Sequence, residues 1–300
     1  MLHTEEPASL LSVWGSSIDD VWVVGGRSEL SGAPAVLRYQ DGSWRREDPG
    51  VTGVDLWWVF GFPDGGVFFG GSEGTILRYR GSSFERMQTP RAGTIFGMWG
   101  ASADDLWAVG DGGLDAAIVW HFDGSQWMEV AQPAGVPRRV FKVHGRASDD
   151  VWMSCADGSA LRWNGATLER QLTGATSPLF SIATTPERVF AVGGVPSFGE
   201  MVEQTGAAWE PVDLNPPVAW RGLAARARTV FALGESGVVA RLEEAGWAFV
   251  EQTSIQGDFH AAWIDPEDGL WSVGGAFNRT PLTTDGFITY FGARAIAPLP

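Results

Sequence analysis

The sequence predicts an all-β protein, a single seven-bladed β-propeller with four antiparallel strands per blade and about 40 residues per blade. Three observations carry this prediction. One short pattern repeats along nearly the whole chain. Each repeat divides into four β-rich segments separated by turn residues. The composition, with Gly 40 and Trp 16, suits many tight turns and many strands.

The repeat is clearest in the stretch SSIDDVWVVGG at residues 16–26. It returns as ASADDLWAVGD from Ala101, RASDDVWMSCA from Arg146 and DPEDGLWSVGG from Asp265. The aromatic residue after the aspartates can be followed through seven units, with 38 to 46 residues between successive copies. These seven anchors are Trp22, Phe68, Trp107, Trp152, Phe190, Phe231 and Trp271.

Four predicted strands follow in order within each unit. The first ends in SVWG, WVFG, GMWG or KVHG in the first four units, and the pattern decays in the last three. The anchor lies on the second strand. The third carries VLRYQDGSW, ILRYRGSSF or VWHFDGSQW with its turn, and the fourth is short, as in WRRED and FERMQ. Two separate sandwiches would also be β-rich, but they would not give one period from end to end.

We therefore expect one domain over residues 1–300. The predicted blades cover residues 8–50, 51–91, 92–135, 136–174, 175–215, 216–253 and 254–300. The seventh unit has a weak fourth strand, ARAIAPLP, whereas LHTEEP near the start is similar to WRREDP of the first unit. We expect residues 2–7 to close the last blade. The alternative is that the C-terminal tail takes that place.

Charge and composition exclude several function classes. The net charge is −15 and lysine is nearly absent, which argues against sequence-independent nucleic-acid binding and against docking on anionic membranes. No apolar run approaches the roughly 20 residues that span a bilayer. The start lacks the regions of a signal peptide, so we expect an extracellular or cell-surface location if a leader was removed and a cytoplasmic one otherwise. The single Cys155 is expected to be a small buried residue of a strand.

The pattern VWG-x4-D-[VL]-W-x-V-G, followed by Y-x-D-G-x-x-W, resembles that of propellers common in bacterial surface and secreted proteins. The VVGG, Tyr and Trp of residues 23–44 are also loosely similar to kelch repeats, although the gap from Tyr to Trp is shorter here. The resemblance covers the whole chain but concerns scaffold residues. It implies the fold and a bias towards recognition, without an activity.

The repeated aspartate pairs, such as Asp19 and Asp20, could serve acid–base chemistry or bind a cation. However, three near-identical pairs in three blades would be spread around a ring and could not converge on one substrate. We expect them in the turn between the first and second strands, where their side chains accept hydrogen bonds from turn amides.

Departures from the repeat are where function is best sought. The connection between the second and third strands is compact in units two, four and six and longer in units one, three, five and seven. These connections share one face of a propeller, so the longer ones predict a binding surface, with surface drift as the alternative. Candidate ligand-binding residues in them are Phe198 and Arg279, and Phe277 is a further aromatic that we expect to be exposed.

A second departure lies three residues before the WG position, at the start of the inner strands. The series there is Leu11, Trp57, Phe96, Phe141, Phe180, Arg221 and His260, so apolar residues are interrupted by a guanidinium and an imidazole. The next position adds Trp58 and Lys142, and Arg139 lies just upstream. Such a group at the channel entrance could recognise a carboxylate, a phosphate or an acidic sugar. Alternatively, the charges pair with Asp55, Asp258 or Glu6 and merely close the channel.

Enzyme signatures are weak. The three tyrosines occupy one repeat position, which indicates packing, and no Ser–His–Asp set or metal-ligand spacing occurs, so we expect no cofactor and no metal. His144, at a Trp position, is expected to be a hydrogen-bonded structural residue. We expect a non-enzymatic, monomeric recognition or scaffold module that binds a protein, a glycan or an acidic small molecule. The alternative is a propeller hydrolase or lyase with His260 as general base or acid beside Arg221.

Overall fold

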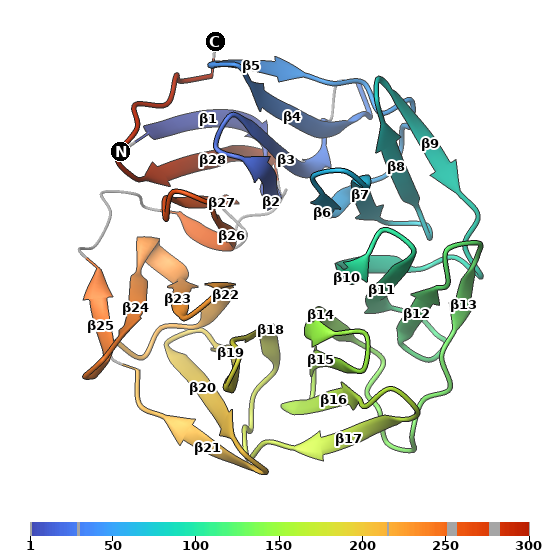
Figure 1. Cartoon of the computed structure of the whole chain (residues 1–300). Helices are drawn as coiled ribbons and strands as arrows, with labels where there is room; N and C mark the ends of the chain where they lie inside the picture. The colour runs from blue at the N-terminus through green and yellow to red at the C-terminus, as the bar shows by residue number, and fades with distance from the viewer. Residues whose placement is uncertain (1, 29–30, 215, 251–256, 276–282, 300) are drawn as a thin grey trace.

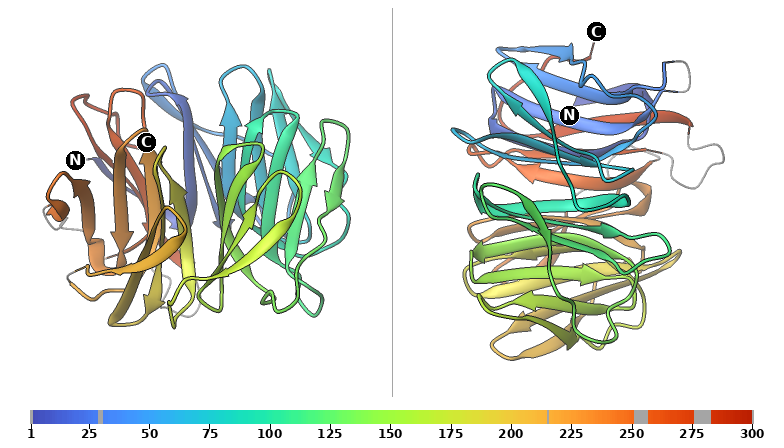
Figure 2. Two further views of the ribbon diagram at one scale, coloured as in Figure 1. Left: turned by 60° about the horizontal axis from the view of Figure 1, so that its bottom comes forward. Right: turned by 90° about the vertical axis from the view of Figure 1, so that its right-hand side faces the viewer.

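The computed structural model describes residues 2–28, 31–214, 216–250, 257–275 and 283–299. Within them, seven four-stranded antiparallel sheets stand around a central channel, with the first strand of each blade innermost (Figure 1). The fold prediction is thereby confirmed. Seen from the side, the strands run between two faces on which the connecting loops gather (Figure 2).

Blades 1 to 4 follow the chain in order. Blade 1 contains β2 (Leu10–Ser17), β3 (Asp20–Arg27), β4 (Pro34–Gln40) and β5 (Ser43–Arg46). Blade 2 contains β6 (Leu56–Phe62), β7 (Gly66–Gly71), β8 (Ile76–Arg80) and β9 (Ser83–Met87). Blade 3 contains β10 (Thr94–Ser102), β11 (Asp105–Asp111), β12 (Ile118–Phe122) and β13 (Trp127–Glu129). Blade 4 contains β14 (Val140–Ala147), β15 (Asp150–Cys155), β16 (Ser159–Trp163) and β17 (Leu168–Leu172).

Blades 5 to 7 complete the ring. Blade 5 contains β18 (Leu179–Thr184), β19 (Arg188–Val195), β20 (Phe198–Thr205) and β21 (Ala208–Val212). Blade 6 contains β22 (Trp220–Arg226), β23 (Thr229–Gly234), the 3-10 turn η1 (Glu235–Gly237), β24 (Val239–Glu243) and β25 (Gly246–Val250). Blade 7 contains β26 (Asp258–Ile264), β27 (Leu270–Gly275), β28 (Thr283–Phe291) and β1 (Leu2–Ala8). No helix among the described residues has the length and apolar character needed to cross a membrane.

Both ends of the chain join the ring. The outer strand of blade 7 is β1, which pairs antiparallel with β28 from Leu2 opposite Tyr290 to Ala8 opposite Thr283 (Figure 1). The C-terminal tail instead packs on blade 1, where Trp44 Nε1 donates a hydrogen bond to the Ala297 carbonyl at 2.9 Å. The first and last parts of the chain are thus held on adjacent blades.

The hydrophobic core lies between neighbouring blades. All seven anchors are buried, as the repeat requires. Trp22 of β3, for example, packs against Phe69 of β7, with ring centroids 5.5 Å apart. Cys155 is fully buried, and burial raises the pKa of its thiol to about 12.

The aspartate pairs have a different role from the one expected. The first aspartate lies in the turn, but serines bond the turn amides: Ser17 Oγ accepts from the Asp19 amide and Ser102 Oγ from the Asp104 amide. The second aspartate opens the second strand and pairs with a cationic or imidazole side chain of the third. These pairs are Asp20 with Arg38, Asp105 with His121, and Asp150 with Arg162. The prediction that aspartate side chains bond the turn amides was therefore wrong at these turns.

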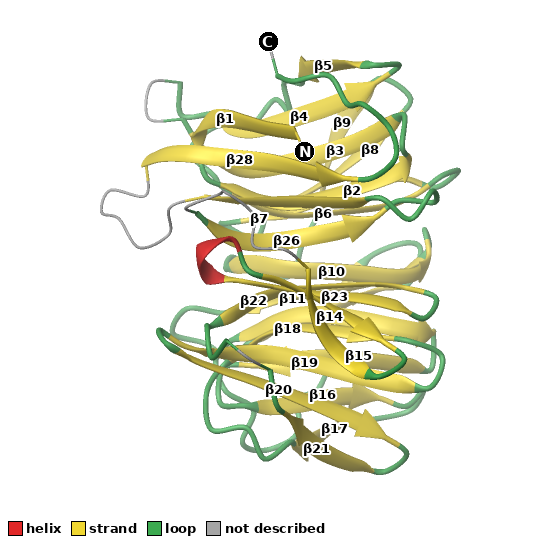
Figure 3. Cartoon of the chain, turned by 90° about the vertical axis from the view of Figure 1, so that its left-hand side faces the viewer, coloured by secondary structure: helices red, strands yellow, loops and turns green. Residues whose placement is uncertain are grey.

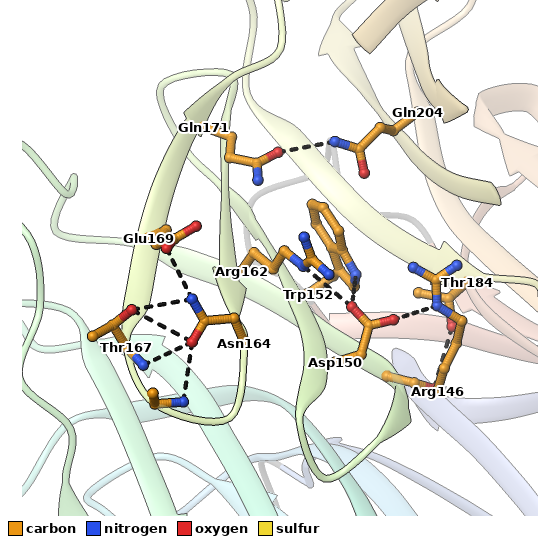
Figure 4. A network of polar contacts seen from close by, with 12 residues as sticks. Arg146, Asp150, Trp152, Arg162, Asn164, Thr167, Glu169, Gln171, Thr184 and Gln204 are labelled. Carbon is orange, nitrogen blue, oxygen red and sulfur yellow. Dashed lines mark hydrogen bonds and ion pairs between the residues drawn. The ribbon is translucent and has the colours of Figure 1, made fainter. Parts of the chain in front are cut away.

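Asp150 shows the arrangement most completely (Figure 4). Its carboxylate accepts hydrogen bonds from Trp152 Nε1 at 2.9 Å, Arg162 Nε at 3.2 Å and Arg146 Nε at 2.5 Å. The Arg162 guanidinium carbon also lies 5.0 Å from the centroid of the Trp152 ring. A single carboxylate thus fixes the anchor indole and joins the first three strands of the blade.

The connections between second and third strands differ in part from the prediction. Residues 112–117 form the longer connection expected in blade 3. In blade 5 the prediction of a long loop was wrong, because β19 and β20 extend as a pair to Val195 opposite Phe198. Only Pro196 and Ser197 remain in the turn, and Ser197 has a φ of 64°. Figure 3 shows the turn between β19 and β20 on the same end of the blades as η1. The blade 7 connection lies outside the described residues.

Candidate functional site

A β-bulge recurs at the same place on the innermost strand of every blade. In blade 2, for instance, Leu56 pairs with Gly71 and Trp58 with Gly70, so Trp57 is the extra residue. A bulge leaves one residue outside the ladder and redirects its side chain. The seven bulged residues are Leu11, Trp57, Phe96, Phe141, Phe180, Arg221 and His260.

Six of these residues line one cavity of about 360 Å³, together with Lys142. They come from blades 2 to 7, and Leu11 of blade 1 contributes its carbonyl oxygen to His260. The bulges lie opposite the ends of the second strands, so the cavity is at the channel end that carries the connections between second and third strands. Its volume falls in the range of small-molecule sites, roughly 300 to 1,000 Å³. We call these eight residues the channel mouth.

Aromatic rings form a nearly continuous collar around the channel mouth. Neighbouring ring centroids are 6.1 Å apart for His260 and Trp57, 5.0 Å for Trp57 and Phe96, and 5.8 Å for Phe96 and Phe141. Phe141 and Phe180 follow at 5.2 Å. Each of these side chains is half-buried, so their faces remain partly open to a ligand.

Arg221 ends the collar. Its guanidinium carbon lies 4.5 Å from the centroid of the Phe180 ring, an arrangement that holds the planar cation against the aromatic face. One of its terminal nitrogens, Nη2, donates to Glu235 Oε1 of η1 at 2.6 Å. The partner is therefore Glu235, a residue that sequence reasoning did not consider. The pair is half-buried, so this carboxylate offsets part of the positive charge that Arg221 brings to the cavity.

His260 is neutral at the channel mouth. Its Nδ1 lies 2.5 Å from the Leu11 carbonyl oxygen, and a carbonyl only accepts, so Nδ1 carries the proton. Burial, with the nearby positive charges of Lys142 and Arg221, lowers the pKa of the imidazole to about 3. At neutral pH Nε2 therefore carries no proton to give as a general acid, and as a base the ring is weak.

Lys142 is the residue after the bulge in blade 4. The side chain is only 6% exposed, and Nζ donates a hydrogen bond to the Phe96 carbonyl at 2.6 Å. The nitrogen also lies 4.0 Å from the centroid of the Trp58 ring, whose Nε1 donates to the Met98 carbonyl at 2.7 Å. Burial lowers the pKa of the Lys142 amine to about 7.

A second cavity of about 220 Å³ lies deeper in the channel. Both Lys142 and Trp58 line it, and Lys142 also lines the outer cavity. Lys142 thus borders both spaces, and Trp58 contacts it from the deeper one. His144 lines the deeper one, and its Nδ1 accepts from Thr184 Oγ1 at 2.9 Å and from the Thr184 amide at 3.3 Å.

The remaining candidate residues lie elsewhere. Arg139 does not line the cavity, and its Nε donates to Asp111 Oδ2 at 2.6 Å, which joins blades 3 and 4. Phe198 is 50% exposed at the tip of the blade 5 hairpin, away from the cavity lining. Arg279 and Phe277 fall outside the described residues.

Another cavity, of about 610 Å³, lies at the opposite end of the strands between blades 1, 2 and 3. Two of its three lining arginines are already engaged. Arg38 pairs with Asp20, and Arg78 donates to the Gly65 carbonyl while lying over the Phe68 ring. In the part of the chain that is described, no group of three His, Cys, Asp or Glu side chains could hold a metal ion.

The fold and the channel-mouth cavity define the class of the protein. It is a seven-bladed β-propeller with a ligand-sized space at one end of its channel. No protein-family model matches the chain, and no curated protein matches it in sequence. The fold is similar to that of a streptogramin B lyase, with 12% identity, a TM-score of 0.73, and coverage of 96% of this chain and 97% of that chain.

Two further solved structures are similar over almost their whole length. YCF48 bound to a D1 peptide has 14% identity and a TM-score of 0.72, covering 97% of this chain and 96% of that chain. The WD40 repeats of RRP9 have 10% identity and a TM-score of 0.75, covering 97% and 98% respectively. At these identities the similarity establishes the fold alone. The three proteins include an enzyme and a peptide complex by their descriptions, so the fold does not choose between functions.

Proposed function

We propose that the protein is a recognition module that binds a small acidic molecule with a flat apolar body at the channel mouth. The observation that carries this proposal is the convergence of four aromatic residues, Arg221 and Lys142 on one 360 Å³ cavity from separate blades. The aromatic faces suit a planar or sugar ring, and the two cations suit a carboxylate. Every residue of the site comes from one chain, so a monomer is sufficient.

The charge balance favours a single anionic group. Glu235 offsets Arg221, whereas no carboxylate of the described residues forms an ion pair with Lys142. A bound carboxylate would supply the missing partner and would favour the protonated amine. Affinity for such a ligand should therefore fall as the pH rises above about 7, because Lys142 then loses its charge.

A calorimetric titration series tests the proposal. The panel is benzoate, phenylacetate, glucuronate, acetate and inorganic phosphate, against the full chain and the R221M and R139M variants. We expect an aromatic or sugar carboxylate to bind, with binding weakened in R221M and unchanged in R139M, whose arginine lies outside the cavity. Binding of every carboxylate equally in all three proteins, or of none, would contradict the proposal.

A protein partner is the second candidate, since exposed apolar residues gather on the same face. Leu114 of the blade 3 connection is 89% exposed, and Val195 and Phe198 flank the blade 5 turn. Aromatic and aliphatic residues of this kind anchor protein interfaces. The matched comparison is an L114S/F198S variant against R221M: a protein partner on the predicted loops requires the first to lose binding and the second to keep it.

The enzyme alternative has less support. A hydrolase or lyase using His260 as general acid needs a protonated imidazole near neutral pH, and the low pKa of this ring removes it. As a base, a group with a pKa of about 3 accepts protons poorly. Turnover of any bound carboxylate by wild-type protein but not by H260N would restore this alternative.

A further inference from the structure

Lys142 is the only lysine in the chain. Of the 21 lysine and arginine residues, 20 are arginine, so cations elsewhere in the protein are guanidinium groups. A guanidinium stays charged at any pH a protein meets, whereas an amine can lose its proton and become a nucleophile. The one position that carries an amine is also a buried position in the wall of the candidate site.

The surroundings of the amine suit a neutral nitrogen. Among the described residues, Nζ has one hydrogen-bond partner, the Phe96 carbonyl at 2.6 Å, and it lies 4.0 Å from the centroid of the Trp58 ring. No carboxylate among the described residues holds the proton in place by an ion pair. A neutral amine keeps its N–H bond to the Phe96 carbonyl and still has a lone pair for reaction.

We propose that Lys142 is an amine nucleophile that captures an aldehyde in the channel mouth as a reversible imine, the aldehyde carrying an aromatic or apolar body and an anionic group. Nζ adds to the carbonyl carbon, which forms the C–N bond and places a proton on the former carbonyl oxygen. Loss of that oxygen as water breaks the C–O bond, and the second amine proton leaves with it, giving C=N and one water. The position of the aldehyde rests on the proposed function.

The charged and titratable groups near the amine leave it unpaired. Arg221 of β22 and His260 of β26 line the same cavity, and His144 of β14 lines the deeper one. None of them is anionic, and both imidazoles are neutral near pH 7. With a pKa of about 7 in place of 10.5, roughly half of the amine is neutral at that pH, on the order of a thousand times the neutral fraction of an exposed lysine.

Reductive trapping tests this proposal. The full chain is incubated near neutral pH with 4-carboxybenzaldehyde and sodium cyanoborohydride, which converts an imine into a stable secondary amine, and the product is mapped by peptide mass spectrometry. With one lysine present, the only amines are Lys142 and the amino terminus. The larger neutral fraction speeds the labelling of Lys142, and the lower nucleophilicity of a less basic amine offsets part of this gain. We therefore expect labelling of Lys142 to be roughly ten-fold or more faster than that of Nα-acetyl-lysine amide.

Three controls keep the experiment decisive. K142R must lose the internal label, R139M must keep it, and acetaldehyde, which lacks both ring and carboxylate, must label Lys142 more slowly. Labelling only at the amino terminus, or at Lys142 no faster than the model amine, overturns the imine. 4-Methylbenzoate, which keeps the ring and the single carboxylate and lacks the aldehyde, separates the two proposals. If 4-methylbenzoate binds in calorimetry and no adduct forms, the imine fails while the proposed function stands. If Lys142 is labelled rapidly although 4-methylbenzoate does not bind, the proposed function fails while the imine stands.

Discussion

The amine nitrogen of Lys142, a residue that lines two cavities of the channel, lies 4.0 Å from the centroid of the Trp58 ring. Blade 4 supplies the lysine and blade 2 the tryptophan, so neither blade alone makes the contact. The amine is held where water is largely excluded, and its partners among the described residues are an aromatic face and one carbonyl.

Replacing Lys142 by methionine should change how stability depends on pH. The folded-state pKa is about 7 and the unfolded value is 10.5, so the unfolded chain binds more protons between these values. The free energy of unfolding therefore rises with pH across this window, by an amount on the order of a few kcal/mol. Urea unfolding at several pH values should show this rise in wild type and in R139M, and not in K142M. An equal rise in K142M would remove Lys142 as its cause.

His144 should control stability on the acid side. Burial and nearby Arg146 lower the pKa of His144 to about 4, from 6.5 in the unfolded chain. The unfolded state thus takes up the proton first, and stability falls as the pH drops from 6.5 towards 4. An H144Q variant should lose less stability over this range than wild type, as measured by urea unfolding. The lowered pKa of His260 contributes in the same direction. The H144Q substitution should therefore reduce the pH dependence of stability without abolishing it.

Asp150 should be far more important than its neighbour Asp149. The D150N substitution removes the charge that binds Arg146 and Arg162 around the Trp152 indole, and we expect a loss of about 1 to 3 kcal/mol. Asp149 is exposed in the turn, so D149N should change stability by less than about 0.5 kcal/mol. Urea midpoints of the two variants give the comparison. Equal effects would mean that the turn, and not the network, sets the requirement for aspartate.

Glu235 should weaken the binding of anions at the channel mouth. Its carboxylate lies 2.6 Å from Arg221, and replacing it by glutamine leaves the guanidinium free to pair with a ligand. We expect E235Q to bind an aromatic carboxylate roughly two- to five-fold more tightly than wild type, and E235Q/R221M to lose the gain. Calorimetry on the three proteins measures it. A gain that persists without Arg221 would show that the effect is long-range and not local.

The periodic part of the protein was predictable because each anchor, such as Trp22 or Trp271, must be buried between blades wherever it occurs. The same period placed Arg221 and His260 at equivalent positions, and they line one cavity. What the period could not supply is the bulge at those positions, since a bulge depends on strand pairing and leaves no mark in residue type.

Partners outside the repeat were also hidden. Glu235 comes from a short turn whose conformation is set by φ values such as 57° at Ser236. The blade 5 hairpin reads as loop because PSFG contains turn residues, although its flanking residues pair as strands. The role of Asp20 depended on Arg38, which lies 18 residues further along the chain and meets it only through the register of β3 and β4.

Because Lys142 is the only lysine, protein grown with lysine labelled with carbon-13 at Cε gives one side-chain signal from the channel mouth. Its chemical shift would be followed against pH by nuclear magnetic resonance, with and without benzoate. We predict a midpoint near pH 7 that moves upward, saturably, as benzoate binds, because the carboxylate stabilises the protonated amine. A midpoint near 10.5, or one near 7 that no carboxylate of the panel moves, would contradict an acid-binding channel mouth built around this amine.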